Sequence, residues 1–134
     1  MELSFGSSDC PATRQPLVLV VDDNEDNLLL LAFVVEQLDC TIITAADGQT
    51  ALDLALNYQP SLILLDMMLP DLDGMEVFIR LRQNPLTSRI PVIAVTAMAR
   101  PQDRDRILSA GFNEYVTKPY AVDELEVLLR QYLC

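Results

Sequence analysis

Short apolar runs recur along the chain, and the segments between them are long enough for a helix. The runs span residues 17–21, 62–65, 92–95 and 115–117. Near-continuous apolar runs of this length are typical of strands in a parallel sheet that is covered on both faces. The pattern therefore predicts a parallel sheet with helices on each side.

Polar residues follow each of these runs directly. The five positions are Asp22, Asp23, Asp66, Thr96 and Lys118. All strands of a parallel sheet point the same way, so residues just past their ends gather at one edge, where open α/β sheets bind their ligands. We therefore expect three carboxylates, a hydroxyl and an ammonium to meet there. Lys118 is the only lysine of the chain, which makes its place beside acidic residues informative.

Capping residues mark the helices that separate the strands. Asn24, followed by Glu25 and Asp26, predicts a helix that runs to about Leu38. Further helices are expected from Asp47-Gly48, after the capping-box pair Asp73 and Glu76, between Pro101 and Gly111, and from Ala121 to about Tyr132. Shorter strands at 41–44 and 113–116 complete five strand–helix units. The expected fold is a doubly wound α/β structure with a parallel five-stranded sheet and right-handed crossovers.

Length and charge narrow the class of protein. The 134 residues fit one domain, with a flexible leader expected at 1–16 and the folded domain at 17–134. The net charge of −11 argues against a nucleic-acid-binding surface. No apolar run approaches the roughly 18 residues of a membrane span, and no secretory signal is visible, so no membrane association and a cytoplasmic location are expected.

The lack of histidine and the spacing of the cysteines argue against several kinds of catalytic and metal site. The chain has no histidine, which removes Ser-His-Asp and Cys-His nucleophile schemes and histidine-ligated zinc. The three cysteines are widely spaced and form no CxxC pair. We expect Cys40 to be a small core residue, and Cys10 and Cys134 to be terminal thiols rather than redox or metal-binding groups.

The acidic residues at the predicted sheet edge need a cationic partner. Two carboxylates about 5 Å apart repel by on the order of 3 kcal/mol at an effective dielectric near 20. Helix capping combined with salt bridging is one interpretation of Asp22, Asp23 and Asp66. The sharper one is a hard divalent cation with oxygen ligands, for which Mg²⁺ is the first choice.

Thr96 and Lys118 extend this interpretation from a metal to a phosphoryl group. Either residue alone has an ordinary explanation, as a strand-end hydrogen bond for Thr96 or a salt bridge for Lys118. Together they supply a hydroxyl donor and a compact positive charge opposite the carboxylates, which suits a bound phosphoryl group. Asp66 would then be the attacking nucleophile and would form an aspartyl-phosphate.

The spacing of these residues resembles the receiver domain of bacterial two-component response regulators. The matching stretches are Val20-Val21-Asp22-Asp23, the run from Leu64 to Gly74, Val95-Thr96-Ala97, and Tyr115-Val116-Thr117-Lys118-Pro119. The resemblance covers the chain from Leu17 onward. It implies a flavodoxin-like, CheY-like fold with strand order 2-1-3-4-5, and transfer of a phosphoryl group to Asp66 from the phosphohistidine of a histidine kinase.

The resemblance also implies a role for each site residue. Mg²⁺ would be bound by Asp23, Asp66 and the backbone carbonyl of Met68, and by Asp22 through water. Thr96 and Lys118 would contact the phosphoryl group. Rotation of Tyr115 would report phosphorylation to the outer face of the last two helices and the last strand, where a downstream protein target would bind. An ordinary half-buried strand tyrosine is the alternative.

Three function classes follow from these residues. The leading one is a stand-alone receiver that switches its binding to another protein. The second is a phosphorelay shuttle that passes the group from Asp66 to a histidine phosphotransfer protein. The third is a hydrolase of the haloacid dehalogenase type, which would need a second Asp where the chain has Met68.

Two features distinguish this chain within the resemblance. Met68 and Met98 lie two residues after Asp66 and Thr96, where neither can position an attacking water, so we expect a long-lived phosphorylated state unless both merely pack at the rim. On the first helix Leu28, Leu31, Val35 and Leu38 share the inward face, whereas Leu29, Leu30 and Phe33 lie opposite. We expect these three to contact the phosphodonor protein; coverage by the leader or a dimer contact are the alternatives.

Overall fold

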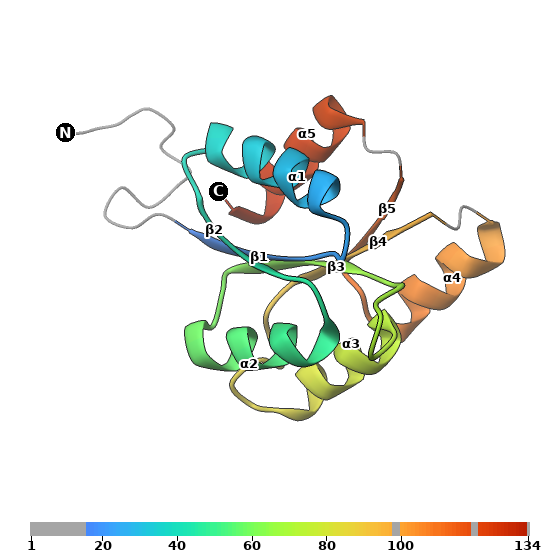
Figure 1. Ribbon diagram of the computed structural model, residues 1–134. Coiled ribbons are helices and arrows are strands. Elements are labelled where there is room, and N and C mark those ends of the chain that lie inside the picture. The colour runs from blue at the N-terminus through green and yellow to red at the C-terminus, as the bar shows by residue number, and fades with distance from the viewer. Residues whose placement is uncertain (1–15, 98–99, 119–120, 134) are drawn as a thin grey trace.

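Strands and helices alternate along the chain in the computed structural model, which describes residues 16–97, 100–118 and 121–133 (Figure 1). The strands are β1 (Leu17–Val21), β2 (Thr41–Ala45), β3 (Leu62–Asp66), β4 (Val92–Thr96) and β5 (Glu114–Thr117). The helices are α1 (Glu25–Gln37), α2 (Gly48–Tyr58), α3 (Gly74–Gln83), α4 (Pro101–Ala110) and α5 (Val122–Leu133). The predicted leader, Cys10, Met98 and Cys134 lie outside the described residues.

The five strands form one parallel sheet in the order β2-β1-β3-β4-β5. β3 lies between β1 and β4, with Leu65 opposite Val21 on one side and Ala94 on the other. The doubly wound α/β fold and its strand order are therefore confirmed. Because β1, β3 and β4 are parallel neighbours, their carboxyl ends lie side by side at one edge.

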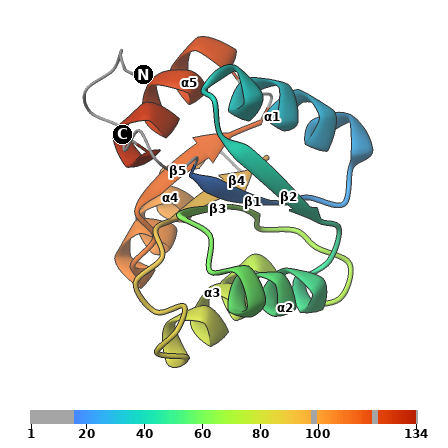
Figure 2. The same cartoon turned by 90° about the vertical axis from the view of Figure 1, so that its left-hand side faces the viewer.

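Helices cover both faces of the sheet. α1 and α5 lie on one face, and α2, α3 and α4 lie on the other (Figures 1 and 2). Side chains alternate between the two layers along each strand, so Val18 and Val20 pack under α1 and α5, whereas Leu19 and Val21 pack toward α2 and α3. Two apolar layers thus fix the sheet from both sides.

The predicted capping residues occupy the helix ends. The side chains of Asn24, Asp47 and Asp73 each accept a hydrogen bond from a backbone N–H in the first turn of their helix. Gly111 ends α4 with a φ of 113°, which glycine adopts without strain. Local signals therefore set where most helices begin and end.

Four of the five predicted strands, all except β1, end one residue later than expected. Asp66 is the last residue of β3 rather than the first residue after it. β5 spans Glu114–Thr117 instead of 113–116, because Asn113 belongs to the preceding turn, where its side-chain oxygen accepts a hydrogen bond of 3.0 Å from the backbone N of Val92. Cys40 is buried in the α1–α5 layer as expected, and burial raises the pKa of its thiol, with a further contribution from Asp39.

No helix within the described ranges is long and apolar enough to cross a bilayer.

Candidate functional site

Three carboxylates meet at the carboxyl edge of the sheet. Asp22 and Asp23 directly follow β1, and Asp66 ends β3. One oxygen atom from each lies within 4.8 Å of the others. Asp22 and Asp66 are buried, with 1% and 3% of their surface exposed, whereas Asp23 is open to solvent. The strand-end geometry thus brings together the acidic residues that the sequence pattern predicts to converge.

Lys118 places its ammonium between the two buried carboxylates. Its Nζ lies 3.0 Å from Oδ2 of Asp66 and 3.2 Å from Oδ2 of Asp22. Burial by itself lowers the pKa of Lys118, but the hydrogen bond and charge of Asp66, together with those of Asp22, outweigh it and raise that pKa. The ammonium therefore stays charged throughout the neutral range.

Lys118 does not fully compensate the cost of burying the negative charge of Asp66. Burial is the largest effect and raises the pKa of Asp66, and the charge of Asp22 raises it further. Hydrogen bonds from the backbone N of Met68 and from Lys118 act in the opposite direction without cancelling it. Three carboxylates against one ammonium leave a formal charge of −2 (−3 + 1). A dication would neutralise that excess.

Thr96 lies at the same edge on the neighbouring strand. It is fully buried at the end of β4, one residue past Val95, which is the register partner of Asp66. The backbone N of Lys118 donates a hydrogen bond of 2.8 Å to the Thr96 carbonyl. Sheet pairing therefore holds the hydroxyl-bearing residue and the lysine next to the acidic residues.

The loop from β3 to α3 is held in place on both sides of Met68. The backbone N of Met68 donates to Oδ1 of Asp66 over 3.0 Å, and 63% of the residue's surface is exposed. Further along, the carboxylate of Asp71 accepts hydrogen bonds from the backbone N atoms of Gly48 and Gln49, at the start of α2. These contacts fix the segment whose carbonyl is the expected metal ligand.

Sequence reasoning missed two residues of this network. Asp71 lies 23 residues along the chain from the helix end that it caps, so no local sequence pattern predicts the contact. Asn27 donates from Nδ2 to Oδ2 of Asp22 over 3.1 Å. A usable signal existed for Asn27, because it stands three residues after the capping Asn24 and hence in the first turn of α1, beside the end of β1.

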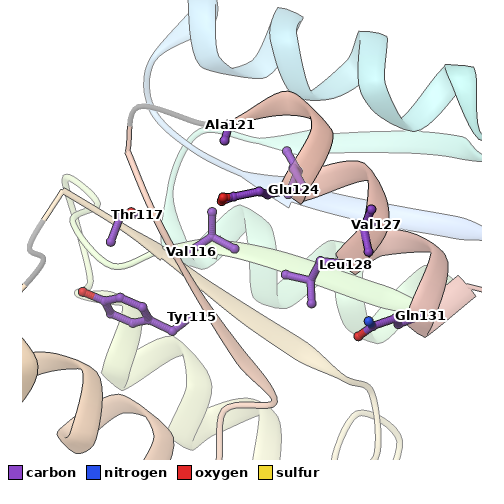
Figure 3. Close-up of a pocket in the computed structure, with 9 residues that line it drawn as sticks. Tyr115, Val116, Thr117, Ala121, Glu124, Val127, Leu128 and Gln131 are labelled. Carbon is purple, nitrogen blue, oxygen red and sulfur yellow. The ribbon is translucent and has the colours of Figure 1, made fainter.

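Tyr115 lies on β5, away from the carboxylates and half-buried. Figure 3 shows its ring directed away from α5, whereas Val116 and Leu128 point into a groove of about 300 Å³ between β5 and α5. Burial raises the pKa of the Tyr115 phenol, and the charge of Asp103 on α4 adds to the effect. Tyr115 therefore lies between α4 and the open groove of the α5 side.

The outer face of α1 is partly apolar. Leu29 and Phe33 have 70% and 57% of their surface exposed. Leu30 is only half-exposed, because it lies at the margin of the outward face. On the inward face, Leu31, Val34 and Val35 are buried, and Leu28 and Leu38 pack against the same layer.

Comparison with known proteins identifies the family. Residues 18–130 match the response regulator receiver domain, so the chain belongs to that family. The polar-differentiation response regulator DivK of Brucella anthropi is 39% identical over 116 residues, which cover 87% of this chain and 94% of DivK. The match displaces the hydrolase alternative.

Solved structures agree with this assignment. The receiver domain of the sensor histidine kinase PA1611 from Pseudomonas aeruginosa, which has a magnesium ion coordinated in its active-site cleft, is 32% identical, with a TM-score of 0.81 over 90% of this chain and 98% of that one. The chemotaxis response regulator CheY4 of Vibrio cholerae shares the fold, with a TM-score of 0.83 at 23% identity over 90% of this chain and all of that one (100%). Receiver domains are signalling modules that take phosphoryl groups from histidine kinases and act on downstream targets.

Proposed function

We propose that this receiver accepts a phosphoryl group on Asp66 from the phosphohistidine of a histidine kinase, in a reaction that depends on Mg²⁺. The observation that carries the proposal is the position of the buried Asp66 carboxylate, within 4.8 Å of two further carboxylates and 3.0 Å from the only lysine of the chain. A buried carboxylate that could act as the nucleophile, acidic oxygens that could bind a metal and a positive charge lie at one sheet edge. That combination suits phosphoryl transfer.

The residues present fit Mg²⁺. Their oxygen ligands are of the hard type that Mg²⁺ prefers, and their formal charge of −2 matches a dication. Asp23, Asp66 and the carbonyl of Met68 would hold the ion directly, and Asp22 would hold it through water. When bound, Mg²⁺ neutralises charge on the oxygens of the transferring group.

The chain's own residues perform the transfer. A carboxylate oxygen of Asp66 attacks the phosphorus atom, a new P–O bond forms, and the P–N bond to the donor histidine breaks. The electron pair of that bond stays on the imidazole nitrogen, which takes up a proton. The ammonium of Lys118 then shifts from Oδ2 of Asp66 to the phosphoryl oxygens, and the hydroxyl of Thr96 donates a hydrogen bond to them.

The switch would run from Thr96 to Tyr115. Thr96 pairs with Thr117 on β5, and Tyr115 lies two residues earlier on that strand. A shift of the Thr96 hydroxyl toward the phosphoryl group would free space beside β5 for the Tyr115 ring. Rotation of that ring would change the α4-β5-α5 face, where the groove between β5 and α5 is already open to a downstream protein (Figure 3).

The phosphodonor protein would dock on α1. Leu29 and Phe33 are exposed on α1, the helix that begins two residues after Asp23. Leu30 adds its exposed half to the same patch. Apolar side chains exposed on one helix suit the helical surface of a kinase.

Intact mass measured after incubation with acetyl phosphate tests the proposed chemistry. The wild type is expected to gain one phosphoryl group with Mg²⁺ and none with a chelator. Asp66→Asn is expected to gain none, whereas Asp53→Asn, which changes an exposed carboxylate on α2, keeps the gain. A phosphoryl group that appears without Mg²⁺, or that survives in Asp66→Asn, would overturn the proposal.

A further inference from the structure

Asn27, in the first turn of α1, donates a hydrogen bond from its neutral amide to Asp22, the most deeply buried carboxylate of the site. Asn27 donates from Nδ2 to Oδ2 of Asp22 over 3.1 Å. Its own backbone N is held by Oδ1 of the capping residue Asn24, also over 3.1 Å. The cap therefore fixes the part of the helix that carries the amide.

Asp22 is held from three directions. Oδ2 accepts from Asn27 and lies 3.2 Å from Nζ of Lys118, while Oδ1 accepts from the backbone N of Asn24 over 2.9 Å. These donors belong to α1, to the residue that follows β5 and to the β1–α1 loop. Because both carboxylate oxygens are engaged, Asp22 cannot turn without breaking one of these bonds, each of which involves a charged acceptor.

Lys118 depends on that fixed carboxylate. Its ammonium bridges Asp22 and Asp66 at 3.2 and 3.0 Å. On the proposed function, phosphorylation converts the Asp66 carboxylate to an acyl phosphate, and the ammonium must leave Oδ2 of Asp66 for the phosphoryl oxygens. The contact with Asp22 is the one that can persist through this step.

We propose that Asn27 is a positioning residue, which fixes Asp22 and through it keeps the Lys118 ammonium where the phosphoryl group arrives. Asn27 carries no charge and touches neither reacting atom. Its effect should therefore pass entirely through Asp22. It should also be visible at Lys118 before any phosphorylation takes place.

The single lysine gives a direct readout of this effect. Protein labelled with ¹³C,¹⁵N-lysine contains one lysine side chain, so the signals of its Cε and Nζ belong to Lys118. In the metal-free protein, Asn27→Ala is expected to shift these signals. The same substitution in an Asp22→Asn background is expected to leave them in place. Asn57→Ala, on the exposed side of α2, is the matched control and should shift nothing.

Phosphorylation kinetics complete the double-mutant cycle. At saturating Mg²⁺, Asn27→Ala is expected to slow phosphorylation by acetyl phosphate about tenfold, the size of one hydrogen bond to a charged group. In the Asp22→Asn background the same change should cost less than about twofold, because contacting residues are not additive. The proposal would be overturned if Asn27→Ala did not shift the Lys118 signals. It would also be overturned if Asn27→Ala slowed phosphorylation equally in the wild-type and Asp22→Asn backgrounds. A wild type that takes no phosphoryl group would instead overturn the proposed function and leave the Lys118 signals as a separate test.

Discussion

The carboxylate of Asp71 accepts a hydrogen bond of 2.7 Å from the backbone N of Gly48, the first residue of α2. A second bond of 3.0 Å comes from Gln49. Asp71 belongs to the β3–α3 loop, so these bonds tie the segment after Asp66 to a helix from another part of the chain. The β3–α3 loop and α2 therefore form one unit.

Removal of this tie should loosen both partners. We expect Asp71→Ala to lower the melting temperature and to weaken Mg²⁺ binding measured by calorimetry, because the helix end loses a charged cap. For Asp71→Asn, the melting temperature and the Mg²⁺ affinity should lie between those of the wild type and of Asp71→Ala. The control Asp105→Ala, on the exposed side of α4, should leave both values unchanged.

The contribution of Asp71 should also depend on pH. Hydrogen bonds from Gly48 and then Gln49 hold the pKa of Asp71 below its usual value of 3.8. A lowered pKa in the folded state means that the stabilisation is present above pH 3.8 and is lost as the pH falls through the folded pKa. A difference in stability between wild type and Asp71→Ala that stays constant in strong acid would contradict this assignment.

Asp66 should have the opposite effect on stability. Burial raises its pKa, so the metal-free folded protein binds a proton more readily than the unfolded chain. Stability should therefore fall as the pH rises from about 3.8 through the folded pKa. In a chelator at neutral pH, we expect Asp66→Asn to be more stable than wild type by about 1 kcal/mol in denaturant titrations. Added Mg²⁺ should stabilise the wild type and leave Asp66→Asn unaffected.

Gly74 allows α3 to start directly against the end of β3. A Cβ atom at this position would lie 2.6 Å from Cα of Met67 and 2.9 Å from the Asp66 carbonyl oxygen, both of which are backbone atoms. We expect Gly74→Ala to destabilise the fold by roughly 2 kcal/mol. Helix propensity alone predicts a gain of about 1 kcal/mol for Gly→Ala, so the sign separates the two effects. Gln83→Ala, in the same helix, serves as the control.

The exposed patch on α1 makes a prediction about partners. Leu29→Glu and Phe33→Glu should reduce the rate of phosphotransfer from a histidine kinase at least about fivefold, as expected for apolar anchors of an interface. Phosphorylation by acetyl phosphate should not change. Tyr58→Glu alters a residue on α2 that is 60% exposed and should affect neither reaction. If the α1 variants transfer at the wild-type rate, the patch serves another contact, such as a dimer.

Met68 makes a prediction about the lifetime of the phosphorylated state. Its exposed side chain lies at the site entrance and cannot hold an attacking water by hydrogen bonding. We expect the phosphoryl group to persist for minutes or longer after the donor is removed, and Met68→Asn to shorten that time. A wild-type half-life of seconds would rule the idea out.

Most of the sheet was predictable because its central strands are buried on both faces. Val18 to Val21 and Leu62 to Leu65 are all at most 2% exposed, and a run that is buried on both faces is apolar throughout. The parallel direction of the strands places Asp22, Asp23 and Asp66 at one edge of the sheet, and the pairing of β1 with β3 brings them close together. The order of the strands did not follow from these runs, since nothing in their composition ranks them, and it rested on the family resemblance.

Contacts between segments that are distant along the chain could not be predicted from the sequence. The Asp71–Gly48 bond depends on how the β3–α3 loop passes α2, and no periodicity records that path. Similarly, Leu30 is half-buried because it lies at the margin of a helical face. At such a position a small difference in the angle around the helix axis decides whether the side chain is exposed. The start of β5 was missed by one residue because the side-chain oxygen of Asn113 accepts a hydrogen bond from the backbone N of Val92 and extends the turn.

The order in which the site residues occur along the chain has a consequence for synthesis on the ribosome. All three carboxylates leave the exit tunnel well before Lys118, because they belong to β1 and β3 and the lysine follows β5. Until then the growing polypeptide carries a cluster of like charges with no resident counter-ion at its sheet edge. Compaction of the first four strands is therefore electrostatically opposed, and the residue that follows the last strand supplies an ammonium that offsets part of this repulsion.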